Sequence, residues 1–151
     1  MKLNNKNLLQ TKLFIDNQFV ESKDLSTFQV TNPATQEVIA TVANATAEDA
    51  LYAIDEAAKA FKTWSGTGVI KRSEVLKKWY RLIIQNKDDL AYILTTEQGK
   101  PLTEAKGEID YAASFVEWFA EECRRTYGNI IPSPNNTKRL MTIKQPVGVV
   151  A

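Results

Sequence analysis

A change of hydrophobic period at Thr46 is the feature that most constrains the fold of this chain. Before Thr46, "KLFIDNQFVES" and two further short runs alternate between apolar and polar residues, with turn signals at Asp16-Asn17 and Asn32-Pro33. After it, apolar residues recur at helical spacing, and Thr46 followed by Asp49 resembles a helix cap. The sequence therefore predicts β-structure over residues 1–42, then helices, which makes an α/β fold.

The helical part divides into segments at recognisable breaks. Gly99 stands where a helix end favours a left-handed residue, and Pro101 prevents continuation. After Gly128, "KRLMTIKQPVGVVA" predicts one or two extended strands, and its final β-branched run is typical of a buried parallel strand, so we expect the chain to stop inside a strand. The helices are expected at about 46–64, 70–86, 87–98 and 102–127.

Composition excludes several classes of function for these residues. With 19 basic and 18 acidic side chains in 151 residues, no strong field favours nucleic acid or an anionic membrane as a partner. The absence of histidine excludes a Ser/His/Asp triad, a Cys/His pair and a His-based zinc site, and the single cysteine, Cys123, can form no internal disulfide. The start of the chain has no signal-peptide pattern, so we expect a cytoplasmic protein.

A carboxylate occupies a helix position where an apolar residue is expected. Leu90, Ile93, Leu94 and Glu97 share one face by the i, i+3, i+4, i+7 rule, so Glu97 is expected to point inward. A buried carboxylate needs a partner. That partner could be a structural ion pair or backbone N–H groups; alternatively, Glu97 could be an oxygen ligand for a cation, completed by backbone carbonyls.

The next helix carries apolar residues on two faces. Tyr111, Phe115 and Trp118 form a stripe roughly opposite a predicted core stripe. Such a helix is buried between two structures. The aromatic stripe could pack against the same fold or a second subunit, or it could line a pocket for a small organic molecule. The core stripe is expected to comprise Ala105, Ile109, Ala112, Val116, Phe119, Cys123 and Tyr127, with Cys123 an inert thiol because Glu121 and Glu122 beside it oppose thiolate formation.

Three stretches carry a resemblance to a known family. They are "TNPATQEVIATV", "EQGKPLTEAKGEIDYAASFVEWFAEE" and "YGNIIPSPNNTKRLMTIKQPVGVVA". Together they resemble the amino-terminal part of the aldehyde dehydrogenase superfamily, and within it the bacterial succinate-semialdehyde dehydrogenases. The resemblance implies that residues 1–127 are the amino-terminal part of the cofactor-binding domain, 128–146 the oligomerisation strands of a homo-oligomer, and 147–151 the start of the next cofactor-domain strand.

The resemblance also implies roles for the unusual residues. The segment that matches Tyr111 and Phe115 lies beside the tunnel through which aldehyde reaches the nucleophile, and Trp118 is a further member of that face. In several relatives the carboxylate matching Glu97 lies close to a monovalent cation that is also held by a backbone carbonyl near Thr31. The family's nucleophilic cysteine, general-base glutamate and main nicotinamide contacts match later positions, so residues 1–151 are expected to hold no catalytic and no cofactor-binding residue, and Cys123 does not match the nucleophile.

The implied activity belongs to a longer chain. The complete enzyme would oxidise succinate semialdehyde to succinate with NADP or NAD, by thiolate attack, hydride transfer and hydrolysis of a thioester. The 151 residues alone are expected to be inactive. Two alternatives remain: a short non-catalytic assembly or binding module derived from the family, and a dehydrogenase for a related aldehyde such as glutarate semialdehyde.

Overall fold

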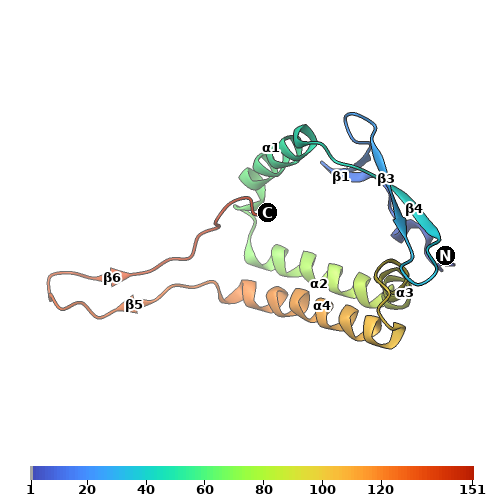
Figure 1. Ribbon diagram of the computed structural model, residues 1–151. Helices are drawn as coiled ribbons and strands as arrows, with labels where there is room; N and C mark the ends of the chain where they lie inside the picture. Colours follow the sequence, from blue (N-terminus) through green and yellow to red (C-terminus); the bar gives the residue numbers. More distant parts are fainter. Residues whose placement is uncertain (1) are drawn as a thin grey trace.

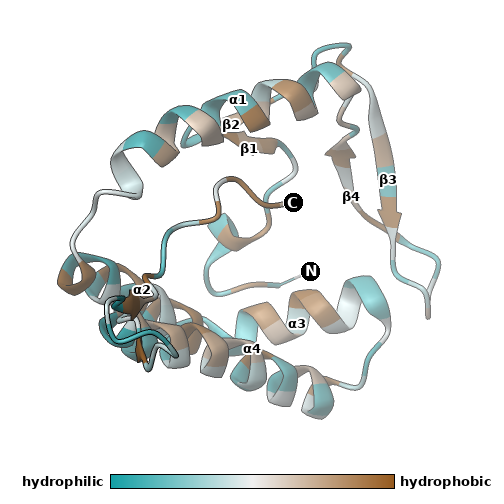
Figure 2. Ribbon diagram, turned by 90° about the vertical axis from the view of Figure 1, so that its left-hand side faces the viewer, coloured by the Kyte–Doolittle hydropathy of each residue, from teal (hydrophilic) through white to brown (hydrophobic). Residues whose placement is uncertain are grey.

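The computed structural model describes residues 2–151, an α/β arrangement of three small antiparallel sheets and four α-helices (Figure 1). Figure 2, turned by 90°, shows three sides of an open arrangement: α1, the β3–β4 sheet, and a layer of α2, α3 and α4. The strands are β1 (Leu13–Ile15), β2 (Gln18–Val20), β3 (Thr27–Thr31), β4 (Val38–Ala43), β5 (Ile130–Ile131) and β6 (Leu140–Met141). The α-helices are α1 (Ala47–Trp64), α2 (Val69–Gln85), α3 (Lys87–Gln98) and α4 (Leu102–Glu122), and the 3-10 turns are η1 (Lys6–Leu8) and η2 (Cys123–Arg125).

The amino-terminal strands confirm the alternating pattern. β1 and β2 form a hairpin whose two turn residues, Asp16 and Asn17, have φ of 48° and 59°. Two consecutive left-handed residues match the twist of a tight hairpin, and Asp and Asn tolerate that region. β3 and β4 pair antiparallel around the Asn32-Pro33 turn, with a register irregularity between Val30 and Thr31.

The helix ends follow from local chemistry. The hydroxyl of Thr46 accepts from the N–H of Asp49 at 3.2 Å, and the carboxylate of Asp49 accepts from the N–H of Thr46 at 2.8 Å, so the expected cap is a complete capping box. Gly99 is left-handed, with φ of 83°, and ends α3 as expected. Where a Cβ on Gly99 would lie, it would meet the ring of Pro33 at 3.0 Å, so the end of α3 lies against the β3–β4 turn.

The fourth helix is shorter than expected. It ends at Glu122 and tightens into η2, whereas the periodicity predicted a helix to Tyr127. Terminal turns of α-helices commonly become 3-10. Here the guanidinium of Arg125 pairs back onto the carboxylate of Glu122, and the hydroxyl of Thr126 donates to the carbonyl of Cys123. The helical spacing of apolar residues therefore extends a few residues past the end of α4.

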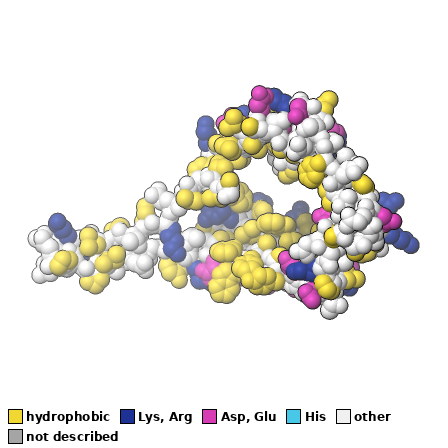
Figure 3. All heavy atoms as spheres, in the orientation of Figure 1, with side chains coloured by type: hydrophobic (Ala, Val, Ile, Leu, Met, Phe, Trp, Pro, Cys, Tyr) yellow, Lys and Arg dark blue, Asp and Glu magenta, His cyan; other side chains and the backbone are white. Residues whose placement is uncertain are grey.

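The described residues bury few large side chains. α2 and α3 both pack along α4. The buried apolar residues are Ile15, Ala91, Ala105, Ala113 and Ala120, while many large apolar side chains on all four helices remain exposed. The space-filling view shows an opening bordered by hydrophobic side chains (Figure 3). An incomplete apolar core of this kind has room for further polypeptide.

The hairpin of β5 and β6 projects from the helices as an arm (Figure 1). Its two pairs, Ile130 with Met141 and Ile131 with Leu140, leave much of these side chains in solvent, with Ile130 86% exposed. Residues 147–151, expected to begin the next strand, are irregular in this structure, and Val147 is 89% exposed. Their assignment to a strand of the cofactor domain stays a prediction. A buried strand needs neighbouring strands, and none lies beside this segment within residues 2–151.

Among the helices described for residues 2–151, none combines the length and the apolar content that a bilayer crossing requires.

Candidate functional site: the aromatic face of α4

The buried face of α4 is built from small residues. Ala105, Ala113 and Ala120 have no exposed surface, and they recur every seven or eight positions along one side of the helix. Alanine permits close approach of a neighbouring helix, and α2 and α3 pack along this side. The predicted core stripe was therefore rotated: Ala112, Phe119 and Tyr127 are exposed, and the packing face runs through Ala113 and Ala120 instead.

The large aromatic residues of α4 occupy the opposite, exposed face. Tyr111 is 65% exposed and Trp118 63%, and the half-exposed Phe115 lies between them. The rings of Tyr111 and Phe115 meet edge to face, with centroids 4.8 Å apart and planes at 80°, a favourable arrangement for aromatic pairs. The structure thus brings the three predicted tunnel residues onto one face and places two of them in edge-to-face contact.

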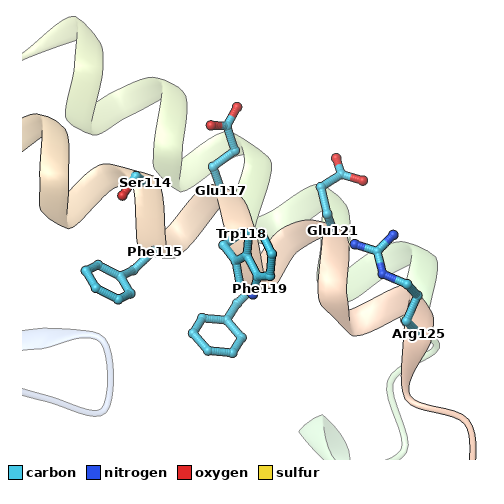
Figure 4. A pocket seen from close by; sticks show the side chains of 7 residues that line it. All are labelled: Ser114, Phe115, Glu117, Trp118, Phe119, Glu121 and Arg125. Carbon is cyan, nitrogen blue, oxygen red and sulfur yellow. The ribbon is translucent and has the colours of Figure 1, made fainter.

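A cavity of about 720 Å³ opens along this face. Figure 4 shows Phe115, Trp118 and Phe119 extending from one side of α4, with Glu117 and Glu121 on the other side and Arg125 beyond the end of the helix. Ser114 completes the lining. Sequence reasoning wrongly assigned Phe119 to the core stripe, although its spacing of four residues from Phe115 was a usable signal for the aromatic face. Such a volume and such aromatic walls suit the apolar part of a small organic molecule.

The charged groups at this end of α4 pair with one another. Lys77 of α2 contacts Glu121 at 2.6 Å, and this hydrogen-bonded ammonium lowers the pKa of the Glu121 carboxyl. Arg125 donates to the carboxylate of Glu122 through Nε at 2.9 Å and Nη2 at 2.6 Å, and the carboxylate raises the pKa of the guanidinium. Glu121 and Arg125 are thus paired, and Glu117 is the one lining residue whose charge has no ion-pair partner among the described residues.

Ion pairs along the α3–α4 contact hold α4 in place. Lys87 contacts Asp110 at 2.5 Å, Lys106 contacts Asp88 at 2.7 Å, and Lys100 contacts Glu108. Each such surface pair contributes little by itself. Asp110 immediately precedes Tyr111, so the pair with Lys87 anchors α4 next to the start of the aromatic face.

Comparison with known proteins identifies the family. The sequence profile of the aldehyde dehydrogenase family matches residues 19–151. The chain belongs to the aldehyde dehydrogenase family. This confirms the resemblance and the fold expected from it.

The relatives of this aldehyde dehydrogenase chain include enzymes for two semialdehydes. It is 48% identical to the glutarate-semialdehyde dehydrogenase of Pseudomonas putida, over all of this chain and 32% of that protein. It is 44% identical to the NADP-dependent succinate-semialdehyde dehydrogenase of Escherichia coli, over all of this chain and 31% of that protein. The crystal structure of a succinate-semialdehyde dehydrogenase from Burkholderia pseudomallei superposes with a TM-score of 0.93 at 43% identity, covering 98% of this chain and 31% of that one. The chain therefore spans about a third of the length of these relatives.

In this aldehyde dehydrogenase chain, Glu97 is not buried as expected. Leu90, Ile93 and Leu94 are half-buried as predicted, but Glu97 is exposed, so its predicted burial is wrong. It lies in the last turn of α3, where the left-handed Gly99 redirects the chain and no described residue covers the side chain. Thr31, the other residue of the predicted cation site, is also exposed; it lies at the end of β3, close to the Pro33 turn that contacts the end of α3.

The thiol of Cys123, the single cysteine, is half-buried. Cys123 lies at the end of α4, with Sγ 3.2 Å from the carbonyl oxygen of Ala120 and 3.5 Å from that of Val69. Within residues 2–151, no group of three or more Cys, Asp and Glu side chains is arranged to hold a metal ion.

Proposed function

We propose that this chain is the amino-terminal part of a nicotinamide-dependent aldehyde dehydrogenase that oxidises succinate semialdehyde, with glutarate semialdehyde as the alternative substrate. The observation that carries the proposal is similarity over all 151 residues of this chain to the first third of dehydrogenases for both semialdehydes, at 48% and 44% identity. Both aldehydes join a reactive carbonyl to a carboxylate through a short apolar chain. The aromatic face of α4 suits that apolar chain, and its role is to bind and orient rather than to react.

The residues present supply a wall of the substrate tunnel. Tyr111 and Phe115 form an edge-to-face pair, and Trp118 extends the same surface along the exposed cavity. Aromatic walls exclude water from the methylene groups of a substrate and restrict its orientation. A positioned aldehyde reacts faster because the cost of orientation has been met on binding. In this role, α4 would discriminate between aldehydes whose methylene chains differ in length.

The cofactor is proposed to be held elsewhere. Residues 2–151 contain no glycine-rich turn leading from a strand into a helix, the arrangement that cradles a dinucleotide pyrophosphate. NADP or NAD would accept a hydride from the substrate when bound to the complete enzyme. The thiolate nucleophile and general base are likewise proposed to lie outside this chain, so the 151 residues alone should not catalyse.

The β5–β6 arm is proposed to assemble subunits through residues 128–146. Within residues 2–151 its strands pair only with each other, and Ile130 and Met141 expose apolar surface away from the helices. Exposed edges and apolar side chains on a projecting hairpin are usually covered by another chain. Changing Ile130 to Asp should lower the oligomeric mass measured by light scattering, whereas the same change at the exposed polar Asn136 should not.

A weaker proposal concerns a monovalent cation near Glu97. The contact between the α3 end and the β3–β4 turn brings the segments containing Glu97 and Thr31 together, but the exposed carboxylate is a less confined donor than expected. Backbone carbonyls of the α3 end and the turn would supply the other ligands.

The first experiment is to determine what the native protein is. An antibody raised against this chain identifies the native product in cells of its source, and the purified product is assayed with both semialdehydes and both cofactors. The proposal expects a product several-fold larger than 17.0 kDa that oxidises at least one of the two semialdehydes. A stable inactive product of 17.0 kDa would favour the assembly module, and a large product inactive on both semialdehydes would refute the substrate class.

A further inference from the structure

A second cavity, of about 580 Å³, lies where four segments meet. Phe61 and Trp64 come from the end of α1, Arg72 from the first turns of α2, and Lys144 from the segment that follows the β5–β6 arm. Thr126, just after η2, contributes to the same lining. Figure 1 shows the chain returning from the arm toward the α1–α2 connection, which is how residues 72 positions apart come to face one cavity.

The charge of this cavity is one-sided. Arg72 and Lys144 line it together with polar and apolar residues, and no Asp or Glu is among them. The cavity on α4 and the one beside β1 and β2 both contain carboxylates as well as cations. The second cavity is therefore a local concentration of positive charge in a chain whose net charge is only +1.

Arg72 has unused binding capacity. Its guanidinium is half-buried, and Nη1 donates to the carbonyl oxygen of Thr67 at 2.6 Å. None of the ion pairs found within residues 2–151 includes Arg72 or Lys144. Partly buried cations are usually paired, because leaving them without a counter-charge is costly. The remaining N–H groups of a guanidinium form a planar fork that fits two oxygens of one anion.

The walls indicate what the anion is attached to. Phe61 is half-buried and Trp64 is 45% exposed, so both rings present apolar surface at the cavity. A bare inorganic ion would gain nothing from these rings, whereas an apolar or planar group would be removed from water by them. The volume lies within the range of small-molecule pockets.

We propose that this cavity binds a small organic anion, a carboxylate joined to an apolar body. Arg72 would hold the carboxylate as a fork, Lys144 would supply a second positive charge, and Phe61 and Trp64 would contact the body. This inference does not depend on the proposed dehydrogenase activity, because neither the aromatic face of α4 nor its cavity shares a residue with it.

The test measures binding to the complete native protein by titration calorimetry, with benzoate as the probe. Benzamide has the same ring without the charge, and inorganic phosphate has the charge without the ring. We expect saturable benzoate binding, no measurable benzamide binding and weaker phosphate binding. Arg72→Gln should weaken benzoate binding about tenfold or more, since a charged hydrogen-bond partner is lost. Lys144→Gln should weaken it by a smaller factor. Lys138→Gln changes an exposed lysine between β5 and β6, outside the lining, and should have no effect.

Two controls keep the outcome interpretable. Circular dichroism checks that Arg72→Gln leaves the start of α2 folded, and Lys144→Gln lies on an exposed segment where folding is not at stake. Benzoate should also change the fluorescence of Trp64, and Trp64→Phe should remove that change. Equal binding of benzoate and benzamide, absence of benzoate binding, or unchanged binding in both charge variants would overturn the proposal. Phosphate binding as tight as benzoate binding would overturn the organic part of it.

Discussion

The two faces of α4 use opposite kinds of side chain. The side that packs on α2 and α3 is lined by buried alanines, while the exposed side carries Tyr111, Phe115, Trp118 and Phe119. A simple expectation is that the largest apolar residues are buried and the smallest exposed. Here close helix packing selects small residues, and the large aromatic surface remains available for another molecule or for more of the family fold. Size alone therefore does not reveal which face of an apolar helix is the core.

The sharpest way to break this contrast is to enlarge the packing face. Ala113→Leu places a branched side chain at a position without exposed surface, where α2 and α3 leave no room. We expect the free energy of unfolding to fall by about 2 kcal/mol or more, as in other overpacked cores. Urea unfolding followed by circular dichroism measures it.

The neighbouring alanine is a matched control. Ala112 is exposed on the same helix, so Ala112→Leu makes the same chemical change without a steric clash. It should alter stability by only a few tenths of a kcal/mol. Equal destabilisation by the two changes would mean that the buried face has been assigned to the wrong side of α4.

Truncating the aromatic face should alter function instead of stability. Tyr111→Ala and Phe115→Ala remove exposed rings that contact each other edge to face, so little packing is lost. In a chimera that joins residues 1–151 to the remainder of the Pseudomonas putida relative, we expect the ratio of kcat/KM for succinate and glutarate semialdehyde to change about tenfold, the scale of a hydrophobic wall contact. Parallel assays of the two aldehydes give the ratio.

A different result would reverse the assignment. If the preference between aldehydes stays constant while the melting temperature falls sharply, the aromatic face serves as core in the complete protein. Glu104→Ala, on the same helix and outside the cavity lining, controls for general effects of substitution in α4.

The Asp49 carboxylate at the start of α1 makes a contribution to stability that depends on pH, unlike the apolar faces of α4. The N–H of Thr46, followed by further hydrogen bonds from the Thr46 hydroxyl and the N–H of Lys23, lowers the pKa of Asp49. The folded state therefore binds its proton more weakly than the unfolded state, whose pKa is about 3.9. The stabilisation is present above that pH and is lost as pH falls through the lower folded pKa.

Asp49→Asn should expose this contribution. At pH 7 we expect the melting temperature to fall by several degrees, because the amide replaces a charged hydrogen-bond acceptor and dipole partner. The difference from the wild type should shrink below about pH 4, as wild-type Asp49 becomes protonated. The loss caused by Ala113→Leu should stay constant over the same pH range, since it involves no titrating group. A pH-independent deficit in Asp49→Asn would contradict the charged capping role.

Local signals in the sequence predicted the elements well and their burial less well. The Asp16-Asn17 turn, the Thr46–Asp49 cap and the Gly99 stop all depend on neighbouring residues, and all are confirmed. The packing face of α4 depends on which helices approach it, and the exposure of Glu97 depends on where the chain turns after α3. Periodicity carries neither kind of information, so Phe119 and Glu97 were both placed on the wrong side.

The shared face of the three aromatic residues was predictable for a reason that helix geometry explains, whereas their tunnel role was implied only by the family resemblance and stays a prediction. Tyr111, Phe115 and Trp118 follow spacings of four and three, which place them on one face whatever packs against the other side. The sequence left open whether this aromatic face packs against more protein or binds a ligand. Membership in the aldehyde dehydrogenase family and the exposed cavity favour a ligand. Substrate preference measured in the chimera distinguishes the two.

The smallest expected effect concerns Glu97, where exposure weakens the case for a cation. Glu97→Gln keeps the shape of the side chain and removes its charge. If this carboxylate is a ligand, potassium should raise the melting temperature of the wild type more than that of the variant, by a degree or two, because an exposed carboxylate competes with water for the ion. Titration with potassium at constant ionic strength, with tetramethylammonium as the replacing cation, isolates specific binding from screening. Identical responses of the two proteins would remove Glu97 from the ligand set, and would leave its side chain as one more solvent-exposed charge in the last turn of α3.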